Sequence, residues 1–327
     1  MSWPARAGVA LLVFVAAFTA FAPVLAPNQP GDQFSDRAYA PPMRIHVRDA
    51  GGFHRPFVYA QIQDDRISRR FHEDTSRRIP LAWFTRGSLV SVDSSAGPLL
   101  LLGGDALGRD VFSRLVLGAR LSLGVTLAGV LGALVIGTIA GALAGSFGGV
   151  AESLLMLAAD FLIVLPGAYL VLVLRSLLSP TLTTPQVFVM MSLLFAVAAW
   201  PHVARGVRAI VAAERTRAYA DAARAAGAGP WRLARHLVPA SWGFLAVEVG
   251  LLIPALLVSE ATLSYLTLGF PEPKPSWGTM LQDAANVTVI GEAPWLLAPA
   301  VALFLVVLGV QLVGRTKTAS ALLAERR

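Results

Sequence analysis

The sequence of 327 residues contains no cysteine, which excludes disulfide bonds, thiolate metal sites and cysteine nucleophiles. Charged residues make up only 14% of the chain, against roughly 25% in soluble proteins. Lysine occurs only at Lys274 and Lys317, and the remaining basic residues are arginines. No Gly-Lys dipeptide is present, so a Walker-type phosphate-binding loop is excluded. Because 55% of the residues are hydrophobic, the composition favours a polytopic membrane protein over a soluble domain.

Six apolar segments stand out in this sequence. A helix that crosses a bilayer core needs about 20 mainly apolar residues, because its backbone groups must be hydrogen-bonded within the segment. Residues 24–26 could also close a cleavable signal peptide, but Pro27 follows directly and disfavours cleavage, so we favour a retained helix. We predict an all-α polytopic membrane protein with six transmembrane helices, at residues 7–26, 121–145, 154–174, 187–201, 244–268 and 293–313.

Basic residues in the loops indicate how the chain crosses the membrane, since short cytoplasmic loops are enriched in arginine and lysine. Residues 202–241 hold seven arginines against two acids, whereas residues 269–292 hold three acids against one lysine. We therefore expect both termini and the 202–241 loop to be cytoplasmic. The polar segment 28–118 then lies outside, because long segments cross largely regardless of their charge.

The outer segment contains two patterns typical of half-buried strands, at residues 44–48 and 57–63, so we expect a small β-rich external insertion. His46, His54 and His72 lie in it without the spacing of a metal site. The whole chain is expected to comprise an N-terminal transmembrane helix (1–27), an extracytoplasmic insertion (28–101), an interfacial amphipathic segment (102–120), a transmembrane domain (121–313) and a cytoplasmic tail (314–327).

Two patterns surround the second predicted helix. Apolar and polar residues alternate at helical spacing over residues 111–116, which predicts an amphipathic helix at the outer interface. Gly137, Gly141 and Gly145 recur four residues apart and form a stripe of small residues. Such a stripe lets a second helix approach closely, so we interpret it as a packing surface.

Asp160, Glu248 and Glu260 are acids inside predicted spans, where an ionised group is costly unless it is paired or hydrated. We interpret Glu248 as a packing residue or a residue at a helix end. For Asp160 and Glu260 two interpretations remain: a polar pathway or proton relay, or a hydrogen-bonded packing residue. No histidine or lysine lies within the spans to complete a proton chain, which weakens the case for a proton-driven pump.

The 202–241 loop contains glycine and proline residues at the positions expected for two short helices joined by a bend. Residues 209–226 are rich in alanine and arginine and predict a helix, which Gly227 is suited to end. Pro230 is suited to begin a second short helix, predicted at 231–237, that stops before Pro239. Its alanine-rich surface is either a docking surface for a partner or simply part of a generic basic loop.

Three motifs together resemble the inner-membrane permeases of ABC importers of the dipeptide, oligopeptide and nickel type, in particular the C-type subunit. Residues 102–123 are similar to the signature LGTDxLGRDxxSRxxxGARxSL, with Gly104 where threonine is usual. Residues 259–269, followed by 276–278, are similar to the stretch EAxLSFLGLG…SWG. The positions that match the first signature before the second helix are Gly103, Asp105, Gly108, Arg109, Asp110, Ser113 and Arg114.

Residues 219–239 resemble the EAA loop of the same family, which couples the permease to its ATPase. Asp221 replaces the usual glutamate, and residues 314–317 depart from the GDxLRD-like tail that is common in the family. The outer segment is also longer than is typical. The matching residues of the coupling loop are Tyr219, Asp221, Ala222, Ala223, Gly227, Arg235, His236 and Pro239.

The resemblance implies a permease subunit of an ATP-driven importer in the bacterial cytoplasmic (inner) membrane. It implies a heterodimer with a second permease, two cytoplasmic ATPase subunits that use ATP, and an extracytoplasmic solute-binding protein. The expected cargo is di- or oligopeptides, with coupling through residues 213–239. No catalytic residue, cofactor, metal or nucleic-acid partner is expected for this chain itself. The alternatives are an ion-coupled secondary transporter, which should show an internal repeat, or the same permease role for nickel or another small solute.

Overall fold

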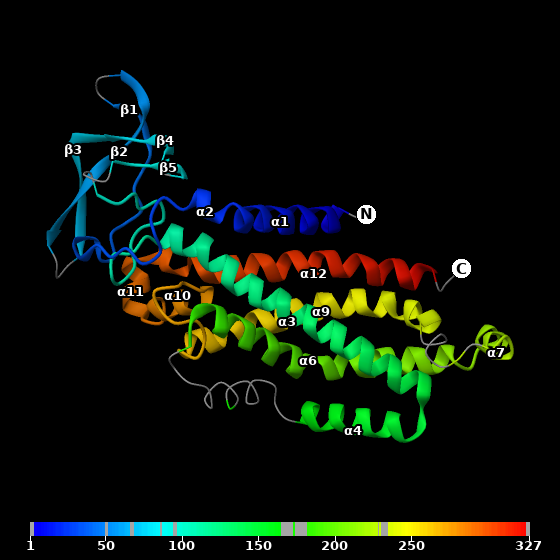
Figure 1. Ribbon diagram of the computed structural model, residues 1–327. Helices are drawn as coiled ribbons and strands as arrows, with labels where there is room; N and C mark the ends of the chain where they lie inside the picture. The colour runs from blue at the N-terminus through cyan, green and yellow to red at the C-terminus, as the bar shows by residue number, and fades with distance from the viewer. Residues whose placement is uncertain are drawn as a thin grey trace. The chain divides into compact units, whose positions relative to one another are not determined.

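The computed structural model of this chain consists mainly of long helices, with strands in the segment between the first helix and the longest one (Figure 1). Helices are expected for such a sequence, because backbone groups within a membrane must be hydrogen-bonded inside the segment. The structure describes residues 3–49, 52–65, 69–85, 87–93, 97–164, 173, 182–227, 229 and 235–324.

The helices differ widely in length. The α-helices, in chain order, are α1 (Trp3–Ala20), α2 (Ala22–Leu25), α3 (Val111–Phe147), α4 (Gly149–Val164), α6 (Thr184–Glu214), α7 (Ala218–Ala225), α9 (Trp242–Tyr265), α10 (Trp277–Asp283), α11 (Val287–Glu292) and α12 (Ala298–Ala324). Short 3₁₀ helices are η1 (Ser35–Arg37), η3 (Val238–Ser241) and η4 (Pro294–Leu297).

Within the described residues, five helical segments are long and apolar enough to cross a membrane. They overlap the first, second, fourth, fifth and sixth predicted spans. The third predicted span, 154–174, begins in α4 and continues into residues outside the described part of the chain. The five segments are Trp3–Ala20, Val111–Phe147, Thr184–Glu214, Arg235–Tyr265 and Pro294–Gly314.

Two helix boundaries differ from the sequence-based expectation. Residues 111–120 are not a separate interfacial helix but the first turns of α3, because the helix continues without a break and buries Val111 and Val116. Residues 202–214 are not part of a loop, because α6 runs through Pro201 to Glu214. The helix continues beyond the proline because Val203 and the apolar residues one and two turns later are fully buried.

The predicted single helix at 209–226 is likewise two helices. It divides at residues 215–217, a turn between α6 and α7. Gly227, by contrast, follows the end of α7 with a φ of 81°, as the glycine at this position predicted. The start of the second short helix falls on residues 230–234, outside the described residues, and residues 235–237 lead helically through η3 into α9.

The segment between α2 and α3 contains antiparallel strands. In the described residues, β1 (His46–Asp49), β2 (Gly52–Asp65) and β3 (Arg70–Pro80) form a sheet in the order β1-β2-β3, and β4 (Ala82–Thr85) pairs with β5 (Ser88–Ser91). The strand patterns predicted at 44–48 and 57–63 overlap β1 and β2. A buried cluster beneath the sheet joins it to the residues before α3; its members are Ala40, Met43, Val58, Ile79, Leu81, Leu99 and Leu100.

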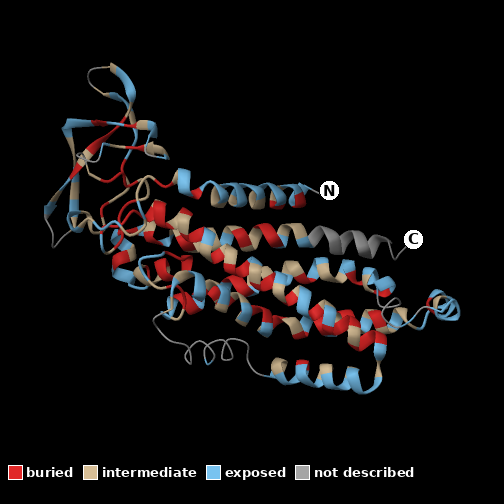
Figure 2. Cartoon of the chain, viewed as in Figure 1, coloured by how far each residue is buried: buried red, intermediate tan, exposed pale blue. Residues whose placement is uncertain are grey.

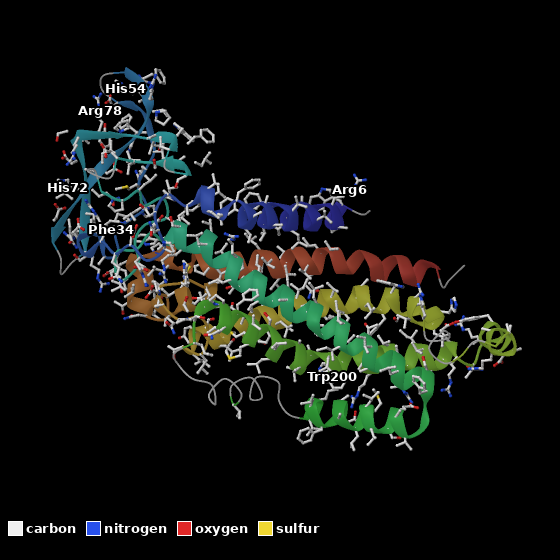
Figure 3. All side chains as sticks on the ribbon, in the orientation of Figure 1. Arg6, Phe34, His54, His72, Arg78 and Trp200 are labelled. Atoms are coloured by element: carbon white, nitrogen blue, oxygen red, sulfur yellow. The ribbon has the colours of Figure 1, made fainter. Side chains whose placement is uncertain are left out.

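The three histidines of these strands each contact a different carboxylate. His46 lies 3.4 Å from Glu73, and His72 lies 2.6 Å from Asp64. His54 lies 3.0 Å from Asp49 and, across the sheet, beside Arg78 (Figure 3). In the described part of the chain, no group of three or more ligand-type residues is arranged to hold a metal ion.

The chain forms two compact units, whose boundaries fall inside helices. The first comprises residues 1–9, 123–260 and 307–327, and the second comprises residues 10–122 and 261–306. Within the first unit α4 packs against α6. Figure 2 shows that α6 carries many buried residues, whereas α4 is mostly exposed and buries Ala159.

The glycine stripe of α3 is a packing surface, as predicted, and the structure identifies α6 as the helix that packs on it. A Cβ on Gly137 would lie 2.5 Å from Cβ of Val203, and one on Gly141 would lie 2.5 Å from the carbonyl oxygen of Ala204. One on Gly145 would meet the backbone of α6 at 2.9 Å. These separations are too short for real side chains, so the two helices depend on glycine for their close approach.

Replacing Gly141 with alanine should therefore destabilise the α3–α6 pair. We expect a loss of about 1–3 kcal/mol, the usual cost of overpacking. Gly250 of α9 is the matched control, because a Cβ added there would have no atom within 4 Å. Alanine there should be neutral or stabilise by up to about 1 kcal/mol through helix propensity. Thermal unfolding of the two purified variants measures the difference, and equal melting temperatures would contradict this packing.

Candidate functional site

The segment that precedes α3 folds into a tight turn around the carboxylate of Asp105. One oxygen of this carboxylate accepts hydrogen bonds from the backbone N–H groups of Leu107 and Arg109, both at 2.9 Å. Gly108 has a φ of 74°, and a Cβ there would lie 1.9 Å from the carbonyl oxygen of Phe34. Any side chain would clash with that backbone and strain the left-handed conformation. The turn therefore requires both Asp105 and Gly108.

Two buried arginines complete what we name the Asp105 cluster. Arg109 Nε lies 2.6 Å from Asp105 Oδ2, and Arg114 Nε lies 3.5 Å from the same oxygen. Glu272 accepts hydrogen bonds from both guanidinium groups, at 2.9 Å from Arg109 and 3.0 Å from Arg114. Asp283 lies 3.7 Å from Arg109. Because a guanidinium stays charged when buried, it needs such carboxylates around it. The cluster ties the residues before α3 to the loop after α9.

Asp283 is destabilised as a charged group by its place in the cluster. Its burial, and then the neighbouring charge of Asp105, raise its pKa to about 6, although Arg109 and Arg114 oppose the shift. Loss of its proton on passing from acid to neutral pH therefore costs stability, because burial and Asp105 outweigh the attraction of the two arginines. The sequence showed this residue only as one acid of an acidic loop.

Asp110 caps the start of α3. Its two carboxylate oxygens accept hydrogen bonds from the backbone N–H groups of Phe112 and Ser113, both at 3.1 Å. Asn28 donates its amide to the same carboxylate at 3.0 Å, and the Ser113 hydroxyl also donates to it. Burial raises the pKa of Asp110 to about 6, and the hydrogen bonds from Ser113 and Asn28 oppose that shift. The cap thus also holds the chain just after α2 against α3.

The glycines of the same motif are fixed by backbone contacts. Gly103 has a φ of 79°, and a Cβ on it would lie 2.7 Å from the carbonyl oxygen of Ala40. A Cβ on Gly104 would lie 2.5 Å from the carbonyl oxygen of Arg37. This contact explains why glycine stands where the family signature has threonine. The segment around η1 lies too close for a larger residue.

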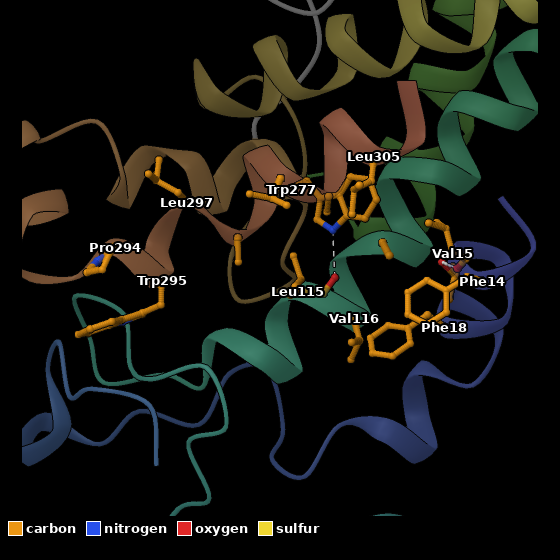
Figure 4. Close-up of a pocket in the computed structure, with 15 residues that line it drawn as sticks. Phe14, Val15, Phe18, Leu115, Val116, Trp277, Pro294, Trp295, Leu297 and Leu305 are labelled. Atoms are coloured by element: carbon orange, nitrogen blue, oxygen red, sulfur yellow. Dashed lines mark hydrogen bonds between the residues drawn. The ribbon is translucent and has the colours of Figure 1, made fainter. Parts of the chain in front are cut away.

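The Ser276-Trp277-Gly278 motif begins α10 and docks it on α3. Ser276 accepts a hydrogen bond from the backbone N–H of Thr279 at 3.2 Å, which caps the helix. Trp277 donates its backbone N–H to Ser122 at 3.0 Å and its indole N–H to the carbonyl oxygen of Leu115 at 3.0 Å (Figure 4). A Cβ on Gly278 would lie 2.3 Å from the carbonyl oxygen of Ala261. The Ser276-Trp277-Gly278 motif is therefore a packing element.

A cavity of about 390 Å³ lies beside this contact and is lined almost wholly by apolar side chains of α1, α3 and α12 and the residues leading into α12 (Figure 4). Trp277 and Trp295 form part of its wall. Both indole N–H groups donate to backbone carbonyl oxygens, those of Leu115 and Gly104. No tryptophan N–H of this wall is therefore left for a polar ligand.

The segment that resembles a coupling loop is built on α7. Tyr219 donates its hydroxyl to Glu214 at 2.8 Å, and this hydrogen bond raises the pKa of the tyrosine. Arg224 donates to Asp221 and, at 2.7 Å, to the carbonyl oxygen of Arg215. These contacts hold α7 against the end of α6.

The remaining residues predicted for coupling differ in exposure. Ala220 is fully buried and anchors α7, whereas the flanking Asp221 and Ala222 are exposed and Ala223 is half-buried. The other members, Gly227, Arg235, His236 and Pro239, are all exposed. The segment therefore presents small and charged residues to its surroundings.

The two acids predicted inside the membrane lie in different environments. Asp160 of α4 forms an ion pair with Arg205 of α6, whereas Glu260 of α9 is fully buried. The structure also pairs Glu152 with Arg208 beside the first pair. Sequence reasoning missed Glu152 because it placed both arginines in a loop. The three-residue spacing of the arginines on one helical face is the signal that would have found the pair.

Comparison with known proteins gives the class of this protein. Residues 133–315 match the family described as binding-protein-dependent transport system inner membrane component. The chain is 36% identical over 215 residues to the glutathione transport system permease protein GsiD of Pectobacterium atrosepticum, which covers 65% of this chain and 69% of that protein. It is 33% identical over 233 residues to the oligopeptide transport system permease protein OppC of Bacillus subtilis, covering 71% and 74%.

Two further matches complete the comparison. The chain is 35% identical over 216 residues to the di/tripeptide transport system permease protein DppC of Pseudomonas aeruginosa, covering 65% of this chain and 69% of that protein. Among solved structures, a chain of the methionine ABC transporter MetNI in an inward-facing form has a TM-score of 0.49 and 20% identity, covering 63% of this chain and 95% of that one.

The apolar helices, the family match and the three permease relatives define a multi-pass membrane permease. The chain belongs to the family of binding-protein-dependent transport system inner membrane components, as its three motifs predicted. Membership implies ATPase subunits and a solute-binding protein as partners. The ABC permease interpretation is thereby supported over the ion-coupled alternative.

Proposed function

We propose that this chain is the permease subunit of an ATP-driven importer of di- and oligopeptides. The observation that carries the proposal is its similarity, over about two thirds of its length, to permeases of oligopeptide and di/tripeptide systems. The glutathione permease among the relatives carries a peptide-like cargo and supports the same chemical class. Nickel or another small solute is the alternative cargo.

The proposed assembly has four kinds of subunit. This chain pairs with a second permease, binds two cytoplasmic ATPase subunits through the segment around α7, and receives cargo from an external solute-binding protein. Both termini lie in the cytoplasm and the strands lie outside the cytoplasmic (inner) membrane. The chain itself has no catalytic site and binds no cofactor, since ATP is used by the ATPase subunits.

In the proposed mechanism, closure of the ATPase pair on ATP moves the α7 segment. A ligand shifts a conformational equilibrium only by its differential affinity for the two states, so ATP must favour one arrangement of the permease helices. The bonds from Arg224 and Tyr219 to the end of α6 support this route, because they make α7 move with a helix that runs through the membrane domain. The opening of the cargo path thus follows nucleotide binding in a separate subunit.

Reconstitution in liposomes tests this function. The complete set of subunits should take up a labelled tripeptide in the presence of ATP, and the purified chain alone should show no flux. Flux through the chain without companion subunits would contradict the proposal. Uptake of nickel but not of peptides would contradict the peptide assignment and leave the permease role in place.

We also propose that the strand segment contacts the solute-binding protein. Deleting residues 41–86 should weaken docking of the binding protein while the ATPase subunits still co-purify. Because Val58 and Ile79 belong to a buried cluster, the exposed Arg70 and Arg77 provide a gentler test. Their joint replacement by glutamate should weaken docking without unfolding the sheet. Unchanged binding in a pull-down with both variants would exclude this contact.

A further inference from the structure

A charged cleft lies between α4 and α6, within the first of the two compact units. Arg205 forms an ion pair with Asp160, with Nε 3.1 Å from the carboxylate, and Arg208 forms one with Glu152. The cleft has a volume of about 550 Å³. Its lining comprises Glu152, Ser153, Met156, Asp160, Arg205 and Arg208.

The charged side chains of this cleft are accessible rather than sealed in the protein. The side chains of Asp160 and Arg205 are 52% and 47% exposed, and that of Arg208 is 41% exposed. Ionised groups within membrane helices face a protein interior or a water-filled cavity rather than lipid. The charged face of α4 therefore requires water or a polar partner in front of it.

A different face of α4 suits the lipid. Leu154, Leu157 and Phe161 recur at helical spacing and are each more than 60% exposed. The cleft residues of α4 follow another helical row, at positions 152, 156 and 160, with Ser153 at its edge. The helix thus separates an apolar outer face from a charged one, which is the arrangement of a helix between lipid and an aqueous path.

The charges and dimensions of the cleft match a short zwitterionic peptide. Two guanidinium groups and two carboxylates give it no net charge, so it offers a partner to each terminus of a peptide. Glu152 and Asp160 are eight residues apart on one helix, or about 12 Å along its axis. Three to four extended residues span about that distance.

We propose that this cleft is a low-affinity binding site for peptide cargo in transit, in which the arginine of one ion pair binds the terminal carboxylate and the acid of the other ion pair binds the terminal ammonium group. The inference rests on the proposed function. It assigns to Glu152, Asp160, Arg205 and Arg208 a direct contact with cargo within the permease.

The absence of cysteine from the chain makes a sharp test possible. Ser153→Cys and Met156→Cys place a thiol in the cleft, and Leu154→Cys and Phe161→Cys are matched controls on the apolar face. The complete transporter, built with cysteine-free companion subunits, is placed in nanodiscs and treated with a charged, membrane-impermeant thiol reagent. Because this reagent attacks hydrated thiolates, the cleft positions should react at least about tenfold faster than the controls.

Tri-alanine should then protect the cleft. The labelling rate of Met156→Cys should fall as the peptide concentration rises and then level off. It should be about threefold lower at twice the peptide concentration that half-occupies the site. Tri-alanine with an acetylated amino terminus and an amidated carboxyl terminus should not protect. Adding Asp160→Asn and Arg205→Gln to Met156→Cys should abolish protection while leaving labelling fast.

Each contrary result overturns the inference. Slow labelling at all four positions would show that lipid or protein covers the cleft, so that it is not open to water. Fast labelling that tri-alanine does not slow would leave water or a lipid headgroup as its occupant. ATPase stimulation by the loaded binding protein is measured in the same samples. If ATP hydrolysis is stimulated but tri-alanine does not protect, only the proposed cleft site is wrong. If ATP hydrolysis is not stimulated in the otherwise unchanged cysteine-free transporter, the proposed function is wrong as well.

Discussion

Replacing Gly227 with leucine should nearly abolish peptide transport and the stimulation of ATP hydrolysis, while the chain still inserts into the membrane. Gly227 has a φ of 81° at the end of α7. A residue with a side chain is disfavoured in this conformation by about 1–2 kcal/mol, and roughly 1.4 kcal/mol already changes a population tenfold. The direction in which the chain leaves α7 would change, and with it the surface offered to the ATPase. Uptake and ATPase rates of the reconstituted complex measure the effect.

Gly229 is the matched control for this variant. It is two residues away, is exposed, has open space where a Cβ would lie, and does not have the left-handed φ of Gly227. Gly229→Leu should therefore retain most activity. Equal losses in the two variants would show that bulk in this segment, rather than the backbone conformation at Gly227, decides coupling. Full activity of Gly227→Leu would contradict the coupling role of the segment.

Replacing Asp105 with alanine should strongly reduce the amount of folded permease. Its carboxylate accepts two backbone hydrogen bonds and lies against two buried guanidinium groups. Removing one partner of a buried ion pair typically costs about 3–5 kcal/mol, because the remaining charge loses its compensation. Arg109 and Arg114 would then depend on Glu272 and the more distant Asp283. Thermal unfolding in detergent and the folded fraction after extraction both measure the loss.

Asp36 provides the control for this variant, since its carboxylate is 64% exposed and its partner Arg37 also donates to the carbonyl oxygen of Gln61. Asp36→Ala should change stability by less than about 1 kcal/mol, because an exposed carboxylate contributes little to an ion pair. A melting temperature for Asp105→Ala equal to that of the parent chain would show that the Asp105 cluster does not hold this region together.

Much of the predicted helical structure followed from the periodicity of apolar residues and from the glycines and prolines that end helices. Long apolar runs identified the helices, because a membrane-spanning segment must hydrogen-bond its own backbone groups. Gly227 marked a helix end correctly, since the left-handed φ favours glycine. Helix boundaries were less predictable. Pro201 suggested an end to α6, but burial of Val203, Val207 and Val211 against the glycine stripe continues the helix.

The candidate sites show the same division. The motif residues Asp105, Arg109 and Arg114 were identified from resemblance, but their partner Glu272 lies more than 150 residues away and has no local signal. The Glu152–Arg208 pair was missed because the arginine was expected in a loop. Pairing of charges across helices depends on how those helices pack, which single-chain patterns do not specify.

What the sequence determined by itself is that this chain has apolar runs long enough to cross a membrane, contains no Walker-type phosphate-binding loop and resembles importer permeases in three motifs. These properties follow from composition and local order, which need no knowledge of distant contacts. Only the tertiary structure decided which acids meet which arginines, why glycine stands at position 104, and that α4 and α6 enclose a charged cleft. Those features arise from the close approach of segments remote in sequence, and their energies depend on burial that exists only once the chain has folded.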